Sequence, residues 1–599
     1  MSDFLYFKLK KKEKLKKKAF LGTWTNNFLN KRENLQSVFI NYESYENYNK
    51  QEIEIKKVKK FSKKILTQLS KKLNNLNNMN WNFKSWNYIL MPFLETYVAI
   101  IFDRIQMAKA LKKNSKIDKK AIYQLGKNSL LISNDYKEFT SNISEVAWNK
   151  KLVSKIYYLL QNKKYLNNLD LFYKKKIKKK FYKKKYIIYS IKNSFLKIFE
   201  RILCGRDKFF FYLGFGNIFS FIYLNLKLRQ FPFFYAYNFM NEFVAKYNAN
   251  LRVRRNLKIN FHQLNFEEKI VCKLLPEIFP TIYLEGLKKQ ISLVDKSFLP
   301  KTKKIIITKS IFKDNLFKFW TANQVNNGSK LICGQHGGNY NFTKDQFKLK
   351  HELDISEKYL TWGWKRDNQK LVPGYCSSII SKKKYIKSNT GNFLLVLAPN
   401  YNYFFYNKAS FFNEIKNGEK EFVLSSNKFT YEFLKNNDSI DRIKVRTHPN
   451  DFRTETPLKP FLDKNFKNLV YDNNKKKLLD TVNKYDLIIF TYMEATSFLQ
   501  CMALNKPCIA FTLDKEILDE DNLQYWEKFY EAGIFHSNAE SAKIIINKNK
   551  SKIYDWWNQN SIQEIIKDYV KKHAFKDGTS ISRVAKCLNN FKKDYEVGL

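Results

Sequence analysis

The sequence predicts an α/β protein, with two Rossmann-like, doubly wound domains behind a helical amino-terminal portion. Apolar residues recur at helical spacing before about residue 200, and short β-rich runs alternate with helical stretches after it. Polar residues gather directly behind several of those runs, as they do where parallel strands meet a ligand. The chain of 599 residues is too long for one ordinary domain and fits two large ones.

The amino-terminal portion begins with a basic lead-in over residues 1–20. Residues 50–78 then carry apolar side chains about one helical turn apart, which predicts an amphipathic helix. Residues 88–104 are nearly all apolar and predict a second helix, interrupted at Pro92. The Lys-rich patch at residues 174–185 is interpreted as solvated surface rather than as a binding element.

Two series of β-rich runs follow, separated by a polar linker. The first series comprises residues 303–308, 331–333 and 359–362, and the second comprises residues 393–397, 443–445, 486–490 and 508–511. Most neighbouring runs are separated by enough chain for a helix. That spacing is typical of parallel sheets with helical crossovers.

The formal net charge of +54 would by itself suggest a nucleic-acid partner. Lysine, however, far outnumbers arginine, the better reader of bases and phosphates. The accompanying excess of Asn, Ile, Phe and Tyr is what an AT-rich genome imposes on its proteins. We therefore expect no nucleic acid, although a nucleic-acid binder stays a rival hypothesis. The charge fits better with a weak attraction to an anionic membrane surface.

Cysteines and apolar segments predict the compartment. The seven cysteines include no CxxC pair, which favours a reducing compartment without disulfides or a cysteine zinc site. The basic run at residues 8–18 is not followed by the apolar segment of a signal peptide. Residues 209–226, the longest apolar stretch, are interpreted as a buried strand, turn and helix. We expect a cytoplasmic protein, with peripheral contact to the inner membrane as an option.

A glycine turn supplies the first candidate site, because ligands bind at the carboxyl ends of parallel strands. The run ending at Cys333 is followed by Gly334, Gln335, His336, Gly337 and Gly338. Glycines let the backbone approach a ligand closely, and an imidazole titrates near neutrality, as a general base should. The alternative is a tight turn whose histidine caps a helix.

Two further strand ends suit an anion. Arg446, Thr447, His448 and Pro449 follow one strand, and a helix beginning there beside an arginine and a histidine would bind phosphate. A second strand is followed by Glu494, Thr496 and Ser497. Hydroxyl groups beside the free backbone N–H groups of a helix start would also bind phosphate. Ordinary strand-to-helix turns are the alternative for both.

Together the three strand ends suit the leaving phosphate of a nucleotide and require no metal. Asp519, Glu520 and Asp521 lie well past their strand, so we expect a solvated loop there rather than a magnesium site. The chain has neither the phosphate loop of ATPases nor a dinucleotide-binding GxGxxG behind a strand. We expect no cofactor beyond a nucleotide-activated donor substrate.

The chain resembles the transferases found in O-antigen and surface-carbohydrate gene clusters. The matching positions span most of the chain: residues 21–24, 73–74, Trp86, Tyr97, residues 102–104, Glu285, Lys318, Trp320, residues 334–338, residues 361–364, residues 446–449 and residues 496–507. The chain departs from the family pattern at Thr25, where a cysteine is usual, and at Asn339 and Asn341, where glycine is more frequent.

Parts of this pattern are also similar to other transferases. The His448–Pro449 pair and the Thr496–Ser497 pair resemble bacterial sialyltransferases and Kdo transferases. Residues 495–496 and 505–507 resemble CDP-glycerol glycerophosphotransferases. These resemblances imply a GT-B fold, a reaction without metal and a CMP- or CDP-linked donor.

We therefore expect a glycosyltransferase of surface-polysaccharide biosynthesis, of the kind that builds lipopolysaccharide O-antigen. Residues 21–385 would form the acceptor-side domain, residues 390–575 the nucleotide-donor-binding domain and residues 576–599 a carboxyl-terminal helix. His336 would be the general base or a second hydrogen-bond donor to the phosphate, with Glu494 as the alternative base. Donor-binding residues would be Gln335, Gly337, Gly338, Arg446, His448, Pro449, Thr496 and Ser497.

The expected partners are a nucleotide-sugar donor and a glycan or lipid-linked acceptor. Two alternatives stay open. The residues do not show whether the transferred group is a sugar or a phosphoalditol, so a phosphoalditol transferase fits equally. The other alternative is a non-catalytic scaffold that retains the fold without the reaction. Trp362 and Trp364 would either stack on a sugar or pack in the core, and Trp24 and Arg104 are assigned to structure.

Overall fold

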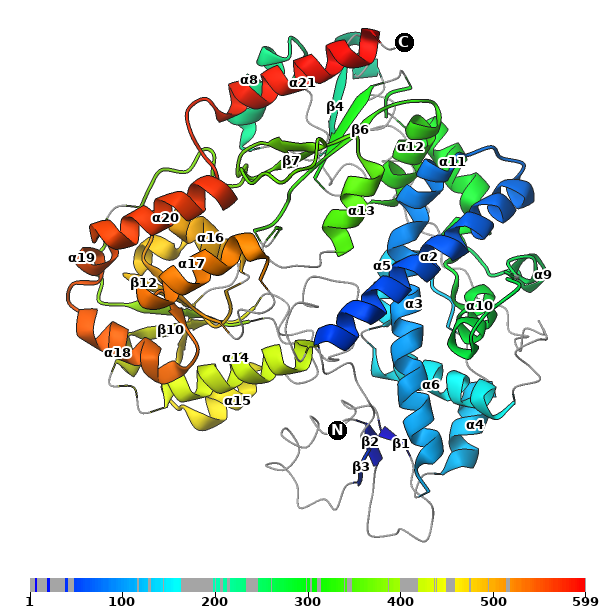
Figure 1. The fold of residues 1–599 in the computed structure, drawn as a ribbon, viewed down its shortest axis with the longest axis horizontal. Coiled ribbons are helices and arrows are strands. Elements are labelled where there is room, and N and C mark those ends of the chain that lie inside the picture. The colour runs from blue at the N-terminus through cyan, green and yellow to red at the C-terminus, as the bar shows by residue number, and fades with distance from the viewer. Residues whose placement is uncertain are drawn as a thin grey trace.

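The structure, a computed structural model, describes most of the chain (Figure 1). Outside the described residues lie 1–5, 8–18, 22–37, 41–47, 116–117, 128–130, 144, 163–197, 200, 205–207, 213–215, 233–245, 260, 298, 302–303, 310–313, 339, 342–346, 386, 399–417, 436, 438, 449–457, 473–475, 494, 513–517 and 598–599. Most of the predicted lead-in and the Lys-rich patch at residues 174–185 therefore lie outside them.

The amino-terminal portion is helical, as predicted. A small sheet of β1 (Tyr6–Phe7), β2 (Ala19–Leu21) and β3 (Val38–Ile40) precedes α2 (Tyr48–Asn77), α3 (Phe83–Lys113), α4 (Lys119–Lys127), α5 (Tyr136–Asn142) and α6 (Val146–Gln161). Helix α3 continues through Pro92, so the predicted interruption there is wrong. Helix α3 is buried along most of its length, and packing on all sides compensates for the missing N–H of the proline.

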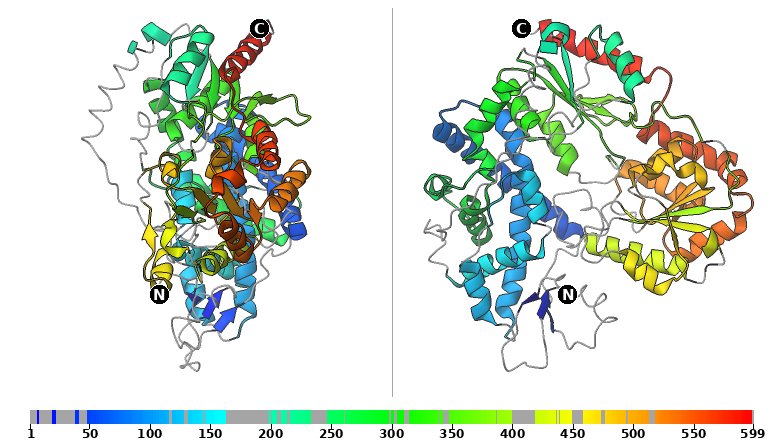
Figure 2. Two further views of the ribbon diagram at one scale, coloured as in Figure 1. Left: turned by 90° about the vertical axis from the view of Figure 1, so that its left-hand side faces the viewer. Right: turned by 180° about the vertical axis from the view of Figure 1, so that it is seen from behind.

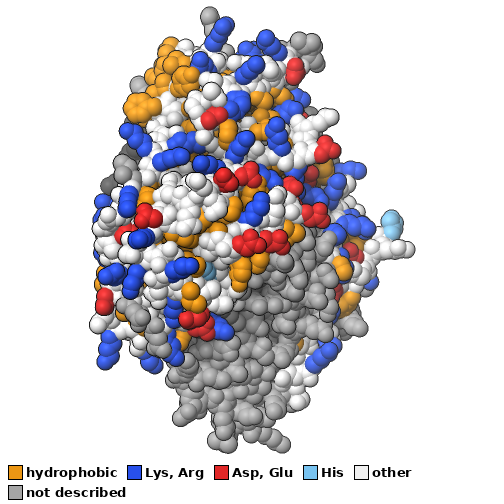
Figure 3. Space-filling view, turned by 60° about the vertical axis from the view of Figure 1, so that its left-hand side comes forward, with side chains coloured by type: hydrophobic (Ala, Val, Ile, Leu, Met, Phe, Trp, Pro, Cys, Tyr) orange, Lys and Arg blue, Asp and Glu red, His pale blue; other side chains and the backbone are white. Residues whose placement is uncertain are grey.

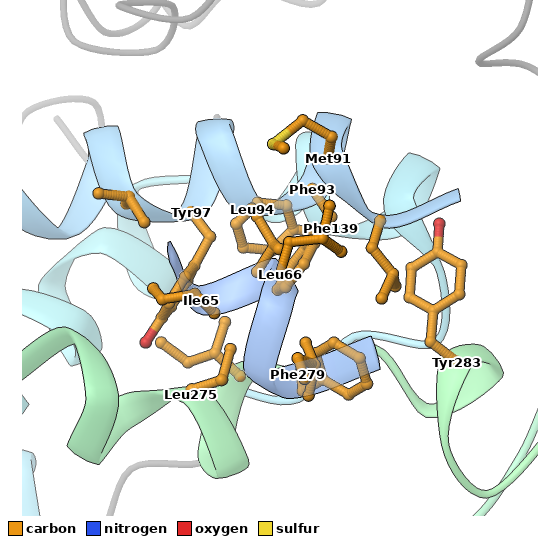
Figure 4. Close-up of a cluster of buried hydrophobic side chains, with 14 of the residues drawn as sticks. Ile65, Leu66, Met91, Phe93, Leu94, Tyr97, Phe139, Leu275, Phe279 and Tyr283 are labelled. Carbon is orange, nitrogen blue, oxygen red and sulfur yellow. The ribbon is translucent and has the colours of Figure 1, made fainter. Parts of the chain in front are cut away.

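Helix α3 is the centre of a large hydrophobic core. Figure 4 shows Phe93 and Tyr97 of this helix among Leu66, Phe139 and Phe279 from neighbouring elements. The ring of Phe93 lies 5.0 Å from that of Phe139 and 5.6 Å from that of Phe279, both edge-on. The same core continues onto one face of the first large sheet, so the helical portion and that sheet pack as one body.

The first large sheet is parallel and runs in chain order. Its strands are β4 (Phe209–Tyr212), β5 (Ile305–Thr308), β6 (Leu331–Gly334), β7 (Lys358–Thr361) and β8 (Leu371–Pro373). Between them lie α8 (Ile218–Lys227), α9 (Leu251–Arg255), α10 (Phe266–Ile278), α11 (Leu287–Lys296), α12 (Asn315–Asn326) and α13 (Phe347–Ile355). Helix α12 packs on the face shared with α3, and α8 packs on the other.

The second large sheet is also parallel, in the order β11-β10-β9-β12-β13-β14. Its strands are β9 (Phe393–Val396), β10 (Ile443–Arg446), β11 (Val470–Tyr471), β12 (Leu487–Phe490), β13 (Cys508–Phe511) and β14 (Phe535–His536). Its helices are α14 (Gly418–Leu434), α15 (Leu458–Asn465), α16 (Thr496–Ala503), α17 (Glu520–Glu531), α18 (Ala539–Asn549), α19 (Ile553–Trp557) and α20 (Asn560–His573). This is the doubly wound order, and it reverses between β9 and β12.

The prediction of an α/β fold with parallel sheets is confirmed. The two sheets differ in one respect, because the described part of the first sheet has no reversal of strand order and so lacks the doubly wound arrangement. Figures 1 and 2 show the sheets in separate parts of the molecule. The chain returns from α20 to α21 (Ser580–Val597), which packs beside α8 on the first sheet.

The predicted strand and helix within residues 209–226 are β4 and α8. Among the residues that the structure describes, none of the helices combines the length and the apolar character that crossing a membrane requires.

Candidate active site

Gln335 fixes the glycine turn at the carboxyl end of β6. Its side-chain oxygen accepts hydrogen bonds from the backbone N–H of Trp362 at 2.9 Å and from the indole N–H of Trp364 at 2.8 Å. Its amide nitrogen donates to the Gly337 carbonyl at 2.7 Å. All these groups are buried, so Gln335 positions the turn, and the two tryptophans pack in the core instead of facing a sugar.

His336, in contrast, is exposed to solvent. Its Nδ1 lies 3.1 Å from the hydroxyl oxygen of Tyr340. That hydroxyl donates to Glu352 Oε1 at 3.4 Å, and Glu352 Oε2 accepts from the Tyr359 hydroxyl at 2.9 Å. Burial raises the pKa of Tyr340 and of Tyr359 well above the usual value, so both hydroxyls keep their protons.

The direction of these hydrogen bonds assigns the imidazole tautomer. Because the Tyr340 hydroxyl gives its proton to Glu352, it accepts from Nδ1–H of His336. The lone pair is then on Nε2 of an exposed ring, which is the arrangement that a general base needs.

The glycine turn also lies against the start of α16 from the second sheet. The backbone N–H of Gly338 donates to Thr496 Oγ1 at 3.0 Å. A Cβ atom on Gly338 would lie 3.0 Å from the Thr496 Cα, which is tighter than ordinary contact, so a glycine fits this approach best. A second contact runs from Asn522 Nδ2 to the Asn341 carbonyl at 2.8 Å. The carboxyl edges of both sheets therefore meet here.

Helix α16 begins where an anion would bind. Thr496 is its first residue, and Ala495 at the cap position makes no side-chain hydrogen bond to the helix. The N–H of Phe498 donates to the Ala495 carbonyl at 2.9 Å, so the N–H groups of Thr496 and Ser497 are the ones that lack partners within the helix by geometry, and Ser497 adds a half-buried hydroxyl. The predicted residues His336, Gly337, Gly338, Thr496 and Ser497 are thus brought together, whereas Glu494 lies outside the described residues.

Arg446 is the last residue of β10, at the predicted strand end, and its guanidinium makes contacts inside the second domain. Its NH1 donates to Asp472 Oδ2 at 2.5 Å and to Thr481 Oγ1 at 3.3 Å, and its NH2 donates to the Lys476 carbonyl. Both members of the ion pair are buried. The guanidinium is committed to the interior of the second domain, so we assign it to holding β10 in place and not to a phosphate.

His448 lies at the same edge of the second sheet as Thr496, beyond β10 and two strands away from β12. It is half-buried, and burial lowers its pKa, which favours the neutral imidazole. Pro449 lies outside the described residues.

Lys309 is a candidate that sequence reasoning missed. It directly follows β5, and Thr308 at the end of β5 pairs with Cys333 of β6, so Lys309 is a neighbour of the glycine turn. Its Nζ donates to the Ser377 hydroxyl, and burial lowers its pKa to about 7. The signal was a lysine immediately after a predicted strand, but lysine is too common in this chain for one to stand out.

Serines 377 and 378 connect this lysine to the second sheet. Gln500 of α16 donates to the Ser378 hydroxyl at 2.6 Å, next in sequence to the partner of Lys309. The first sheet therefore contributes an exposed imidazole and a half-buried amine at one edge, and the second sheet contributes a helix start. That combination can neutralise an anionic leaving group and accept a proton beside it.

The acidic cluster at residues 519–521 takes part in the contact between the two sheets. Asp519 caps α17 and accepts from Arg366 NH2 at 2.5 Å. Within the described ranges, no three His, Cys, Asp or Glu side chains are grouped as a metal site would require.

A family model described as LIC12162 family transferase matches residues 7–588. Among solved structures, a protein assigned as a UDP-N-acetylglucosamine 2-epimerase from Listeria monocytogenes matches with 10% identity and a TM-score of 0.33, over 64% of this chain and 96% of that one. The UDP-GlcNAc 2-epimerase from Neisseria meningitidis, bound to UDP-GlcNAc, matches with 11% identity and a TM-score of 0.28, over 61% and 98%. No curated protein matches the chain.

Proposed function

We propose that this chain, which belongs to the LIC12162 family of transferases, transfers a sugar from a cytidine nucleotide to a surface-polysaccharide acceptor. The observation that carries the proposal is the hydrogen bond from Gly338 to Thr496. It joins a turn that holds an exposed histidine to the start of helix α16. A base and an anion site from two parallel sheets then face one reaction centre, as a GT-B glycosyltransferase requires.

In the proposed reaction the donor phosphate lies at the start of α16. The backbone N–H groups and the hydroxyls of Thr496 and Ser497 stabilise the charge that develops on the leaving nucleotide. Lys309 adds a positive charge from the first sheet. His336 Nε2 removes the proton from the acceptor hydroxyl, whose oxygen forms the new bond to the anomeric carbon while the bond to the nucleotide phosphate breaks.

This proposal divides the work between the domains. Residues 390–575 would bind the nucleotide, and residues 21–385 would bind the glycan or lipid-linked acceptor. The cytidine base and the O-antigen setting are supported by the sequence resemblances to surface-carbohydrate, sialyl and Kdo transferases. The absence of a metal requirement is part of the proposal and is tested with it.

The test is calorimetric titration of the purified protein with CMP, CDP, UDP and GDP, with and without EDTA. We expect a cytidine nucleotide to bind most tightly and EDTA to leave its affinity unchanged. Thr496→Val removes the hydroxyl at the helix start and should lower affinity about tenfold. Thr430→Val is the matched control, because the Thr430 hydroxyl bonds within α14, to the Ser426 carbonyl at 2.7 Å.

The other outcomes revise or overturn the proposal. Preference for UDP or GDP would replace the cytidine donor, and a loss of affinity in EDTA would contradict the metal-independent reaction. Binding of none of these nucleotides would overturn the transferase mechanism and favour a scaffold. Mass spectrometry of products from CMP-sugars and from CDP-glycerol then separates sugar transfer from phosphoalditol transfer.

A further inference from the structure

Exposed apolar side chains are concentrated in one short part of the chain. Of the thirteen large apolar side chains that are exposed among the described residues, eight lie between residues 198 and 231. Phe219 and Ile202 are each 75% exposed, and Leu226 is 62% exposed. Isolated exposed apolar residues are ordinary, but a concentration of this kind marks an interaction surface.

The surface is centred on α8, which is apolar on both of its faces. Phe221 and Leu224 are buried against the first sheet. Ile218, Phe219, Tyr223 and Leu226 are exposed on the opposite side. Figure 3 shows hydrophobic side chains gathered at the upper end of the molecule, where α8 lies. We call the exposed side chains of residues 218, 219, 223 and 226 the α8 surface.

Neighbouring contacts extend the α8 surface. Phe231, just beyond α8, packs edge-on against Phe199 with 6.0 Å between ring centroids. That contact places the exposed Ile198 and Ile202 beside the carboxyl end of α8. On the other flank Tyr223 bonds to Ser582 of α21, with 3.2 Å between the hydroxyl oxygens.

The surroundings of the α8 surface are basic. Arg201, Lys227 and Arg229 are exposed next to it, and the two acidic residues of this stretch, Glu200 and Asp207, lie outside the described residues. Helix α21 adds the exposed Lys586, whereas its Arg583 is paired with Asp577 at 3.0 Å. Bulky aliphatic and aromatic side chains surrounded by cations fit the interface of an anionic lipid bilayer, where the apolar groups enter the acyl boundary and the cations meet the headgroups.

We propose that the α8 surface docks the protein on an anionic membrane, without crossing it. The inference does not depend on the identity of the donor nucleotide or on the role of His336. It assigns a specific surface to the membrane contact that the overall charge only suggested.

The experiment is co-sedimentation of the full chain with vesicles of phosphatidylethanolamine and phosphatidylglycerol. We expect the wild-type protein to bind and added salt to weaken the binding. Phe219→Ser combined with Leu226→Ser should lower the partition coefficient at least about tenfold. Ile544→Ser is the matched control, because Ile544 is 57% exposed on α18 of the other domain, and it should bind like the wild type.

Charge is tested separately with Lys227→Glu combined with Arg229→Glu. This variant should lose affinity for the anionic vesicles and keep the same weak affinity as the wild type for vesicles of phosphatidylcholine alone. Unchanged nucleotide binding and thermal unfolding show that each variant is folded. Failure of the wild type to bind, or equal binding by the Phe219 and Leu226 variant, would overturn the proposal. A dimer in sedimentation velocity that the same variant dissociates would replace the membrane with a second copy of the chain.

Discussion

The carboxyl edges of the two large sheets present different chemistry. At the edge of the first sheet the polar groups are side chains: His336 is exposed, and the half-buried Lys309 donates to the Ser377 hydroxyl. At the edge of the second sheet the most basic side chain, Arg446, forms a buried ion pair with Asp472. What the second sheet offers there is the backbone and the hydroxyls at the start of α16.

This difference indicates how the site divides its tasks. A helix start binds an anion through fixed N–H groups and needs no charged side chain. Proton transfer needs a titratable side chain with a defined tautomer, and the Tyr340–Glu352 contacts supply one on the first sheet. The predictions below run from the largest expected effect to the smallest. They test whether the first edge carries the chemistry and whether Arg446 has a structural role.

His336→Ala should lower the rate of transfer by about 10²- to 10⁴-fold, because the acceptor proton loses its base. Nucleotide affinity should change little, since the phosphate is bound mainly from α16. The measurement is kcat with the donor that calorimetry identifies, alongside a nucleotide titration of the same variant. Equal rates for variant and wild type would remove His336 from the reaction.

Arg446→Met should lower the free energy of unfolding by about 3–5 kcal/mol, because it leaves the buried carboxylate of Asp472 without its charged partner. Lys459→Met is the control, since its ion pair with Asp463 is half exposed on both sides and should contribute less than about 1 kcal/mol. The measurement is denaturant unfolding. Weakened nucleotide binding with unchanged stability would instead indicate that Arg446 binds the donor phosphate.

Lys309→Met tests the cation of the first edge through pH. The pKa of Lys309 is lowered from 10.5 to about 7, so its amine is charged below pH 7 and neutral above it. A bound phosphate favours the charged form, so wild-type affinity should fall by up to about tenfold for each pH unit above 7, and the variant should lose this dependence. Calorimetry across this range measures it, and parallel slopes would contradict the assignment.

The same shift affects stability. Between pH 7 and 10.5 the unfolded chain carries a proton on Lys309 that the folded chain lacks, so this group makes stability rise with pH in that window. Denaturant unfolding of Lys309→Met should show a shallower rise than the wild type.

Tyr340→Phe should lower kcat by only about two- to tenfold, since it removes one hydrogen bond to His336 and no reacting group. Its distinguishing effect is a displaced pH–rate profile with KM unchanged, because the imidazole loses the contact that fixes its tautomer. Tyr359→Phe removes a hydroxyl from the far side of Glu352 and should displace the profile less. A profile that stays in place would leave Tyr340 with a purely structural role.

Much of the architecture could be predicted from local pattern. Hydrophobic periodicity and glycine placement act over a few residues. They predict the strands, the helical amino-terminal portion and the turn of residues 334–338. Three of the strand ends were recognised as candidate sites for the same reason. The continuation of α3 through Pro92 was not predictable locally, because burial on all sides compensates for the missing backbone donor.

The sequence by itself determined where the backbone would present polar residues, because strand ends follow from hydrophobic runs. Only the tertiary structure decided which side chains face a ligand. Arg446 is the last residue of β10 and His336 lies two residues beyond β6, so both are at carboxyl ends of strands, but Asp472 pairs with the arginine and holds it inside the second domain. Lys309 and Ser377 are 68 residues apart and Gly338 and Thr496 are 158 apart, so these contacts depend on how the sheets pack, which no local pattern encodes.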